Sequence, residues 1–294
     1  MTSALTALPI AQNRTGILLM IAASFVFAVQ DGISRHLAAE YNVILIVMIR
    51  YWFFAAFVCA IAGRQAGSIR KAAQTEQPGL QILRGVLLVA EICVMVTGFV
   101  YLGLVESMAI FTLYPLTIAA LSGPILGEPV GWRRWLAIGV GFCGILLIIQ
   151  PGFGVFSPYA LIPLASAVMF ALYGLLTRLV ARKDKASTSF FWTGVAGAVA
   201  ITPFGLASWE PINGFDIVWM ALLCVTGALG HYLLIKCYEV AEASVVQPFA
   251  YMHFVFGASI GILIFAEMLD LWIIAGAAIV IAAGVFTILR GAKA

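Results

Sequence analysis

Residues 43–62 read VILIVMIRYWFFAAFVCAIA, a stretch in which Arg50 is the one charged side chain. A helix that crosses the hydrocarbon core of a bilayer needs about 20 predominantly apolar residues, so this stretch is typical of a transmembrane helix. The whole chain shares this character, because 63% of its 294 residues are hydrophobic, 10% are charged and the mean hydropathy is +1.08. Soluble domains are usually about 25% charged. The composition therefore predicts an integral membrane protein and argues against a soluble enzyme or a nucleic-acid-binding protein.

Polar breaks divide the chain into ten segments of about this length. The predicted spans cover residues 16–38, 43–62, 80–102, 105–126, 132–149, 158–179, 187–207, 216–237, 243–266 and 271–289. These segments nearly fill the chain and leave no soluble domain of useful size. The fold class that we predict is an all-α integral membrane protein, a bundle of ten transmembrane helices.

The basic residues indicate how the spans are oriented. With the N-terminus inside, every Lys and Arg lies on the cytoplasmic side except Arg35, near the outer end of the first span, and Arg50, inside the second. The positive-inside rule explains this asymmetry, so the net charge of +3 requires no anionic partner. Both termini are expected in the cytoplasm.

The two halves of the sequence resemble each other at a spacing near 140 residues. The matched elements are Phe27-Ala28 with Phe170-Ala171, Ser34-Arg35 with Thr177-Arg178, Glu106 with Glu242, and LGEP at 126–129 before Trp132 with FAEM at 265–268 before Trp272. Each half holds five predicted spans, and five is odd. The second half therefore enters the membrane the other way up, which makes an inverted repeat of the kind found in many secondary transporters.

These elements resemble the drug/metabolite transporter superfamily, specifically its EamA-domain members, over roughly residues 14–290. The resemblance is closest in kind to bacterial inner-membrane exporters of amino acids and related metabolites. It implies two inverted five-helix repeats, residues 14–150 and 151–290, around a central cavity that opens alternately to each side. Spans 1, 3, 4, 6, 8 and 9 would line this cavity. The second half departs from the pattern, because it lacks the Gly-Glu-Pro run.

Charged side chains inside the spans are candidates for the substrate pathway, since they are costly in a bilayer. Asp31 and Arg50 each lie about seven residues, or about 10 Å, from the outer ends of the first two spans. They could pair, either to bind substrate or only to fix the packing of two helices. Glu91, in the middle of the third span, has no obvious cation at its depth. We interpret it as a site for a substrate amine or a proton, with a structural carboxyl as the alternative.

Two prolines mark a second candidate region. Pro115 and Pro248 fall inside equivalent spans of the two halves, and each removes a backbone donor near the middle of the membrane. They are predicted kinks or hinges close to a substrate site. The polar residues assigned to the site from this region and its neighbours are Tyr114, Tyr173, His231, Gln247, Tyr251 and His253. The alternative is that the prolines only permit close packing, and that His231 only joins two helices by a hydrogen bond.

No catalytic, metal or cofactor site is expected. The five cysteines show no CxxC or Cys/His cluster and are predicted to be buried thiols, neither disulfides nor metal ligands. Motifs of intramembrane proteases are absent from the sequence, which argues against an enzyme. A channel is a further alternative, although a chain that carries both repeats can form a path as a monomer.

The sequence thus predicts a secondary transporter in a bacterial-type inner membrane, with the lipid bilayer and a small-molecule substrate as its partners. Because Arg50 is the one cation predicted in mid-membrane, the solute should be neutral or zwitterionic, with amino acids foremost. A nucleoside-like, riboflavin-like or drug-like solute is the alternative.

Overall fold

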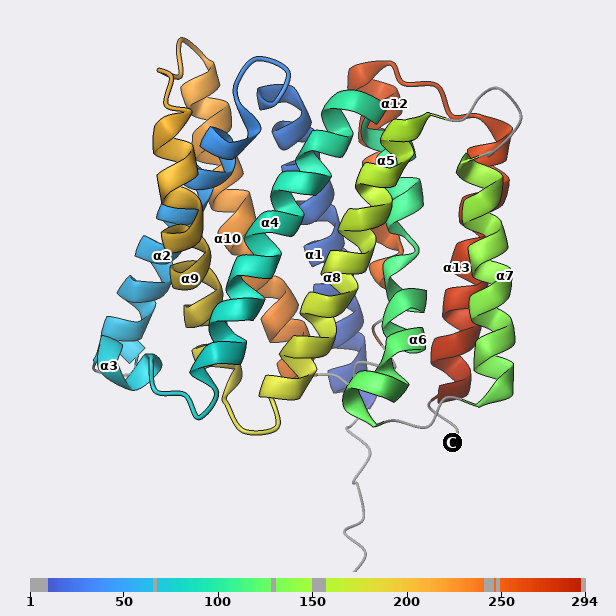
Figure 1. Cartoon of the computed structure of the whole chain (residues 1–294), viewed down its shortest axis with the longest axis horizontal. Coiled ribbons are helices and arrows are strands. Elements are labelled where there is room, and N and C mark those ends of the chain that lie inside the picture. Colours follow the sequence, from blue (N-terminus) through green and yellow to red (C-terminus); the bar gives the residue numbers. More distant parts are fainter. Residues whose placement is uncertain are drawn as a thin grey trace, which may run out of the picture.

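The computed structural model describes residues 10–65, 68–127, 131–149, 157–240, 246 and 249–291, and all regular structure in these ranges is helical (Figure 1). The helices are α1 (Ile10–Leu37), α2 (Val43–Gln65), α3 (Ile69–Ala72), α4 (Pro78–Leu102), α5 (Leu104–Phe111), α6 (Tyr114–Leu126), α7 (Trp132–Ile149), the 3-10 turn η1 (Pro158–Ala160), α8 (Leu161–Val180), α9 (Ala186–Ala207), α10 (Asp216–Val240), α12 (Met252–Phe265) and α13 (Leu271–Gly291).

Most of these helices are long enough to cross a bilayer. Within the described residues, seven helical stretches have the length and hydropathy of a membrane span, with α5 and α6 counted as one. Shorter apolar helices cover 135–149, 252–265 and 271–286. The chain is therefore a multi-pass membrane protein. The arrangement of ten spans in two halves stays a prediction, since seven stretches meet these criteria within the described residues.

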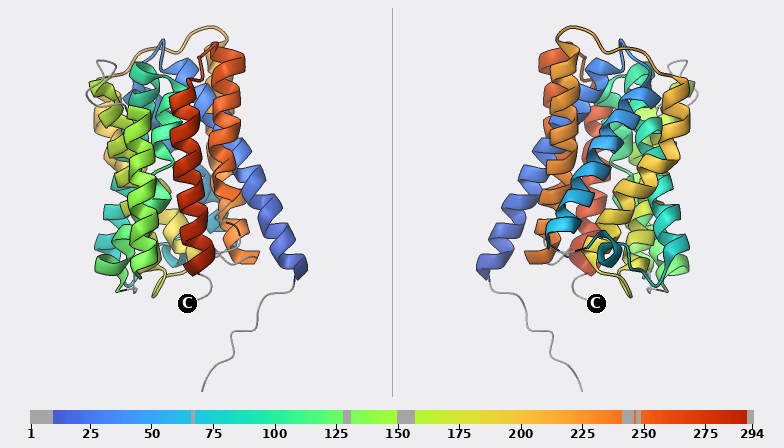
Figure 2. Two further views of the ribbon diagram at one scale, coloured as in Figure 1. Left: turned by 90° about the vertical axis from the view of Figure 1, so that its right-hand side faces the viewer. Right: turned by 90° about the vertical axis from the view of Figure 1, so that its left-hand side faces the viewer.

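The helices stand side by side in one bundle. α2 and α9 lie along one side, α7 and α13 lie along the other, and α1, α4, α8 and the α5–α6 pair lie between them (Figures 1 and 2). The start of α1 and the end of α13 are at the same end of the bundle (Figure 2). We call this the tail end, and the opposite end, with the α1–α2 and α12–α13 turns, the turn end.

The outside of the bundle is apolar. Large side chains such as Leu263, Val199 and Trp132 are 82%, 70% and 71% exposed, respectively. Such exposure of apolar surface is unfavourable in water but matches the hydrocarbon core of a bilayer.

α7 and α13 pack tightly because glycines face each other. A Cβ on Gly144 would lie 2.8 Å from the Gly276 carbonyl oxygen, and a Cβ on Gly276 would lie 2.6 Å from the Gly144 oxygen. Small residues at a helix interface let two backbones approach closely, which is a main source of packing energy between membrane helices.

The predicted span 105–126 is broken in its middle. α5 ends at Phe111 and α6 begins at Tyr114, with Thr112 and Leu113 in the turn between them. Pro115 stands in the first turn of α6. Its ring is incompatible with the carbonyl of residue 111 in a continuous helix, and it has no N–H to donate, so the helix ends there and restarts. The break therefore interrupts the regular helix between Phe111 and Tyr114.

A second break separates α4 from α5 at the turn end. Gly103 has φ +91° and ψ 168°, a conformation essentially confined to glycine. Beyond it, the backbone N–H groups of Leu104 and Val105 donate to the Glu267 carboxylate at 2.9 and 2.8 Å. Arg35, from α1, lies 3.7 Å from the same carboxylate. A carboxylate at a helix N-terminus satisfies free N–H groups and complements the helix dipole, so Glu267 anchors α5 to the α12–α13 turn.

Candidate functional site

The charged candidates gather in the middle of the bundle, where α1, α2, α4, α10 and α12 meet. Asp31 of α1 pairs with His253 at the start of α12, with Oδ2 2.9 Å from Nε2. The side chains of Asp31 and His253 are 15% and 22% exposed, so the pair is only partly buried. The expected pairing of Asp31 with Arg50 is therefore wrong. The partner of Asp31 comes from the second half of the chain.

Arg50 is left without a carboxylate. Its side chain is 6% exposed, and among the described residues no hydrogen bond or ion pair to it is present. The guanidinium lies against α10, where a Cβ on Gly227 would be 3.0 Å from Arg50 Nε. A side chain at this position would press on the guanidinium. A small enclosed cavity of about 10 Å³, enough for one water molecule, is lined by Arg50, Tyr51 and His231.

Glu91 is also buried, with 3% of its surface exposed, and it lies in α4. Ser166 of α8 donates a hydrogen bond to Glu91 Oε1 at 2.6 Å. Among the described residues no cation forms an ion pair with the Glu91 carboxyl. Glu91 and Arg50 are thus buried side chains of opposite charge that do not form an ion pair with each other.

Aromatic side chains cover these charges on two sides. The rings of Tyr114 and Phe170 meet edge to face at 4.9 Å between centroids, and Phe170 lies 5.9 Å from Tyr173. On the other side, His231 stacks on Phe54 at 5.6 Å and meets Phe27 at 5.2 Å. Flat rings with polar edges of this kind suit a solute that carries a ring of its own.

Tyr251, which the sequence assigned to the substrate site, has its hydroxyl against α13. Its side chain is 7% exposed and packs against α13, because a Cβ on Gly284 would overlap the Tyr251 hydroxyl. That hydroxyl has no hydrogen-bond partner among the described residues. Tyr251 is therefore placed in helix packing rather than beside Asp31. Gln247 and Pro248 lie outside the described residues.

Arg84, which the charge pattern places on the cytoplasmic side near the start of the span 80–102, is a buried side chain that is 1% exposed. It donates to Gln81 Oε1, to the Tyr173 hydroxyl at 3.1 Å and to the Ser189 carbonyl. Gln81 Nε2 in turn donates to Asp184 Oδ2 at 2.8 Å. All hydrogen-bond acceptors of Arg84 among the described residues are neutral, and its guanidinium also lies over the Tyr173 ring, 5.3 Å from the centroid, close to the tail end of the bundle.

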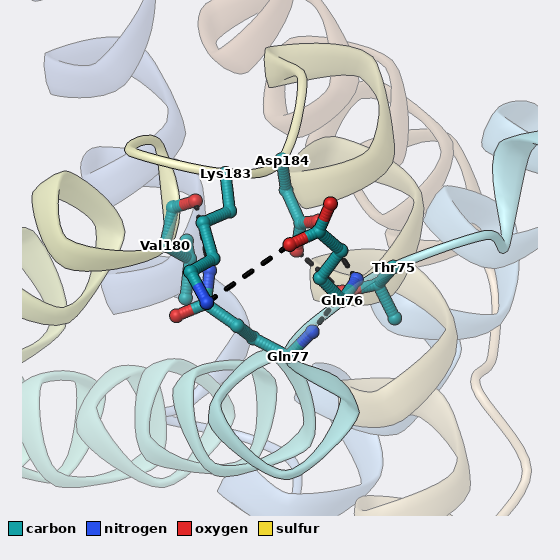
Figure 3. A network of polar contacts seen from close by, with 6 residues as sticks. All are labelled: Thr75, Glu76, Gln77, Val180, Lys183 and Asp184. Carbon is teal, nitrogen blue, oxygen red and sulfur yellow. Dashed lines mark hydrogen bonds and ion pairs between the residues drawn. The ribbon is translucent and has the colours of Figure 1, made fainter.

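Asp184 is the centre of a polar network that joins two loops at the tail end (Figure 3). Thr75 donates to one carboxylate oxygen, and the backbone N–H of Glu76 donates to the other at 3.1 Å. Partial burial would raise the pKa of Asp184, but the hydrogen bonds from Thr75, Gln81 and Glu76 outweigh it and lower this pKa below its usual value. The network ties the loop before α4 to the loop between α8 and α9.

Sequence patterns did not identify Gln30, Ser166 or Tyr51 as parts of this centre, or Arg84 as part of the buried network near the tail end. Ser and Gln are common in membrane helices, and nothing in their spacing distinguishes a residue that faces the bundle interior from one that faces a neighbour. The signal that could have found Gln30 is its position next to Asp31, one turn from Phe27 on the same helix.

The cysteines do not form a site in the described residues. All five are free, Cys224 and Cys237 are buried, Cys59 and Cys93 are half-buried, and Cys143 is exposed. The prediction that all are buried is thus wrong for Cys143, which lies on the outside of α7. In the part of the chain that the structure describes, no three His, Cys, Asp or Glu side chains are grouped so as to hold a metal ion.

Comparison with known proteins gives the family. The EamA-like transporter family matches the chain twice, at residues 14–150 and 157–290. The riboflavin transporter of Vibrio cholerae is 29% identical over 275 residues, which cover 90% of each chain. The S-adenosylmethionine uptake transporter of Rickettsia prowazekii is 24% identical over 261 residues, 89% of this chain and 88% of the relative. The pseudopaline exporter of Pseudomonas aeruginosa is 26% identical over 281 residues, 92% of this chain and 94% of the relative.

A solved crystal structure of a protein shares the fold. Its TM-score is 0.61 at 16% identity, and the match covers 97% of this chain and 98% of that one. The match of the family to nearly the whole length, together with the apolar helices, leaves one assignment: the chain belongs to the EamA-like transporter family of the drug/metabolite transporter superfamily.

Proposed function

We propose that this protein is a secondary transporter that moves a small metabolite across a bacterial inner membrane by alternating access. Ten spans form two inverted units, residues 14–150 and 151–290, and both termini are cytoplasmic. Family membership and the transport names of the relatives support this function. The relatives are named for both uptake and export, so the direction of transport is left to the experiment.

The charged side chains between the two halves are the main support for the site. Asp31 belongs to the first half and His253 to the second, and they meet in the middle of the bundle with part of their surface accessible. In transporters built from inverted repeats, substrate binds near the midplane between the repeats, close to broken helices. The α5–α6 break supplies such a point, with Tyr114 as the first residue after it.

The proposed solute is a small metabolite with a flat heteroaromatic ring. Riboflavin and S-adenosylmethionine, for which two relatives are named, both carry such a ring. Phe111, Tyr114 and Phe170 form an aromatic cluster with centroid distances of 4.9–5.4 Å. The names of these relatives give no support to amino-acid export. An aromatic amino acid is the second candidate, favoured by the opposite charges of Arg50 and Glu91.

Uptake by proteoliposomes tests the proposal. Purified protein is reconstituted and offered riboflavin, S-adenosylmethionine, adenosine, tryptophan and glucose 6-phosphate, each with and without a pH gradient. We expect saturable uptake of at least one solute that carries a flat ring and no uptake of the sugar phosphate. Empty liposomes and liposomes with an unrelated membrane protein are the controls. Uptake of glucose 6-phosphate alone would contradict the proposed solute class, and uptake of none would contradict the proposed function.

A further inference from the structure

A groove of about 370 Å³ runs along the outside of the bundle between α7 and α13. The two helices form one side of the bundle, and the start of α7 and the end of α13 both lie at the tail end (Figures 1 and 2). Leu136, Val140 and Phe286 line the groove and are 62%, 48% and 42% exposed. The groove is therefore an apolar surface that faces the bilayer.

One cation stands at the end of this groove. Arg133, in the first turn of α7, lines the groove beside Trp132 and is exposed. Its guanidinium lies over the Trp132 ring, with Cζ 5.4 Å from the centroid. Among the described residues no carboxylate pairs with Arg133, and no Asp or Glu lines the groove. Tryptophan and arginine are typical of the membrane surface, where the ring lies among lipid headgroups and the cation faces their phosphates.

The start of α7 is a second feature that favours an anion at this place. The first N–H groups of a helix have no acceptor within the helix, and the helix dipole makes this end positive. Gly131, directly before α7, has no side chain to accept from them, and no acidic residue stands in the first turn. A Cβ on Gly131 would meet nothing within 4 Å, so the space beside these groups is open.

The start of α5 shows what an anion does at such a position in this protein. There, the Glu267 carboxylate accepts from the N–H groups of Leu104 and Val105. At α7, the described residues supply no carboxylate of this kind, although Arg133 adds a positive charge. An anion from outside the chain therefore fits the start of α7 in the way that Glu267 fits the start of α5.

We infer that the α7–α13 groove binds an anionic phospholipid of the surrounding membrane. The headgroup phosphate binds the Arg133 guanidinium and the N–H groups at the start of α7, and an acyl chain lies in the groove along Leu136, Val140 and Phe286. Arginine suits the phosphate because its planar guanidinium forms paired hydrogen bonds to two oxygens. A lipid with a cationic headgroup amine brings a second positive charge toward Arg133, so the site prefers a lipid with net negative charge.

The groove and the charge together favour a lipid over two other occupants. A free phosphate ion leaves the apolar groove unfilled. A second copy of this chain, docked by a two-fold axis centred on the groove, brings two Arg133 side chains toward each other, because such an interface uses the same patch twice. A phospholipid supplies both the negative charge and the apolar chain.

This inference goes beyond the transport function and does not depend on the solute, so it is tested by lipid binding alone. The full-length protein is purified in a neutral detergent without added lipid. Dioleoyl phosphatidylglycerol is then compared with dioleoyl phosphatidylcholine, which has the same acyl chains and no net charge, and with glycerophosphoglycerol, which has the phosphate and no acyl chains. Thermal unfolding measures stabilisation by each probe, and native mass spectrometry counts the bound lipids and protein chains.

We expect phosphatidylglycerol to raise Tm by about 3 °C or more beyond the effect of phosphatidylcholine, and glycerophosphoglycerol to leave Tm unchanged. Arg133→Gln should remove this difference between the two lipids. Val140→Phe, which places a ring in the groove, should weaken binding of phosphatidylglycerol about 10-fold while Arg133 is kept.

Each variant has a matched control. Arg70→Gln removes another exposed cation, in α3, and Val199→Phe enlarges a side chain on the outside of α9 that is 70% exposed. Both should respond to the lipids as the unchanged protein does. Because the readout is the difference between two lipids, a general loss of stability in a variant does not imitate the expected result.

Four results would overturn the inference. They are equal effects of the two lipids on the unchanged protein, an Arg133→Gln variant that keeps the difference, a Val140→Phe variant that binds phosphatidylglycerol unchanged, and glycerophosphoglycerol that stabilises as strongly as the lipid. A protein dimer without bound lipid, lost in the Val140→Phe variant, would assign the groove to a second copy instead.

Discussion

The pairing of Asp31 with His253 is the contact in the bundle centre that links the two halves most directly. Chains of Asp, Glu and His side chains form the proton relays of many membrane transporters. The same two side chains are partly accessible, so a proton can reach them. The pair is therefore suited to couple transport to a proton gradient.

Replacing His253 by Gln tests this coupling. The amide keeps a hydrogen bond to Asp31 but does not take up a proton. We expect solute uptake to lose its response to an imposed pH gradient, while exchange of solute across the membrane continues. Uptake into proteoliposomes with and without a gradient is the measurement. His36→Gln is the control, because His36 forms the corresponding contact with Asp216, at 3.3 Å, at the turn end of the bundle. An unchanged gradient response in the His253 variant would exclude this role.

Asp184 is expected to stabilise the tail end of the bundle. Asp184→Asn replaces one carboxylate oxygen by an NH2 group, so a single neutral oxygen is left to accept the hydrogen bonds from Thr75, Gln81 and the backbone of Glu76. Because the site is partly exposed and screened, we expect a modest fall in Tm of about 2–4 °C at pH 7. Thermal unfolding in detergent gives the value. Glu76→Gln, which removes only a surface ion pair to Lys183 at 4.0 Å, should leave Tm almost unchanged.

The effect of Asp184 should depend on pH in one direction. The pKa of Asp184 is lower in the folded protein than in an unfolded chain, where it is about 3.9. Its contribution to stability is therefore fully present above the unfolded value and is lost as pH falls through the folded pKa. The difference in Tm between Asp184→Asn and the unchanged protein should shrink below about pH 4. A difference that grows on acidification would contradict the hydrogen-bonding role.

The depth of charged residues was predictable from the sequence, but their partners were not. Asp31, Arg50 and Glu91 were placed inside spans by counting along apolar segments, and the structure places them in the interior. The pairing of Asp31 with His253 depends on how α1 and α12 are rotated about their axes, which hydropathy does not encode. Arg84 was predictable as a cation near the cytoplasmic end of a span, but its burial was not, because the positive-inside rule does not distinguish a buried cation from an exposed one.

Breaks in the helices fix the shape of the path through the bundle. The α5–α6 break is explained by one proline, and the α4–α5 break by Gly103 and the carboxylate of Glu267. The first break was predictable from the sequence, because proline disrupts a helix wherever it stands. The second was not, since its cap comes from a residue far along the chain.

Gly103→Ala tests the α4–α5 turn. A Cβ there would lie 3.0–3.2 Å from the Glu267 carboxyl group, and φ +91° is strained for alanine. We expect Tm to fall by about 5 °C or more. Gly139→Ala is the matched control, because a Cβ at Gly139 meets nothing within 4 Å and alanine favours a helix. Thermal unfolding of both variants is the measurement, and an equal Tm for both would show that the turn tolerates a side chain.

The orientation of the whole bundle follows from its charges. Ser157 and Glu210 lie in connections without Lys or Arg, whereas Lys185 lies in a basic loop. Single cysteines at positions 157 and 210, in a chain without its own cysteines, should react with a membrane-impermeant maleimide added to intact cells. A cysteine at position 185 should react only after permeabilisation. The reverse labelling pattern would show that the protein has the opposite orientation, with both termini outside the cell.

Alternating access by the whole bundle is tested most directly by exchange. Proteoliposomes are loaded with an excess of the solute that the uptake panel moves best, and entry of the labelled solute is followed. A carrier whose central site faces one side at a time should show saturable entry that internal solute accelerates several-fold, and Arg50→Gln with Glu91→Gln should abolish it. Entry that rises in proportion to concentration and ignores internal solute would contradict the account, because it describes an open pore rather than a carrier.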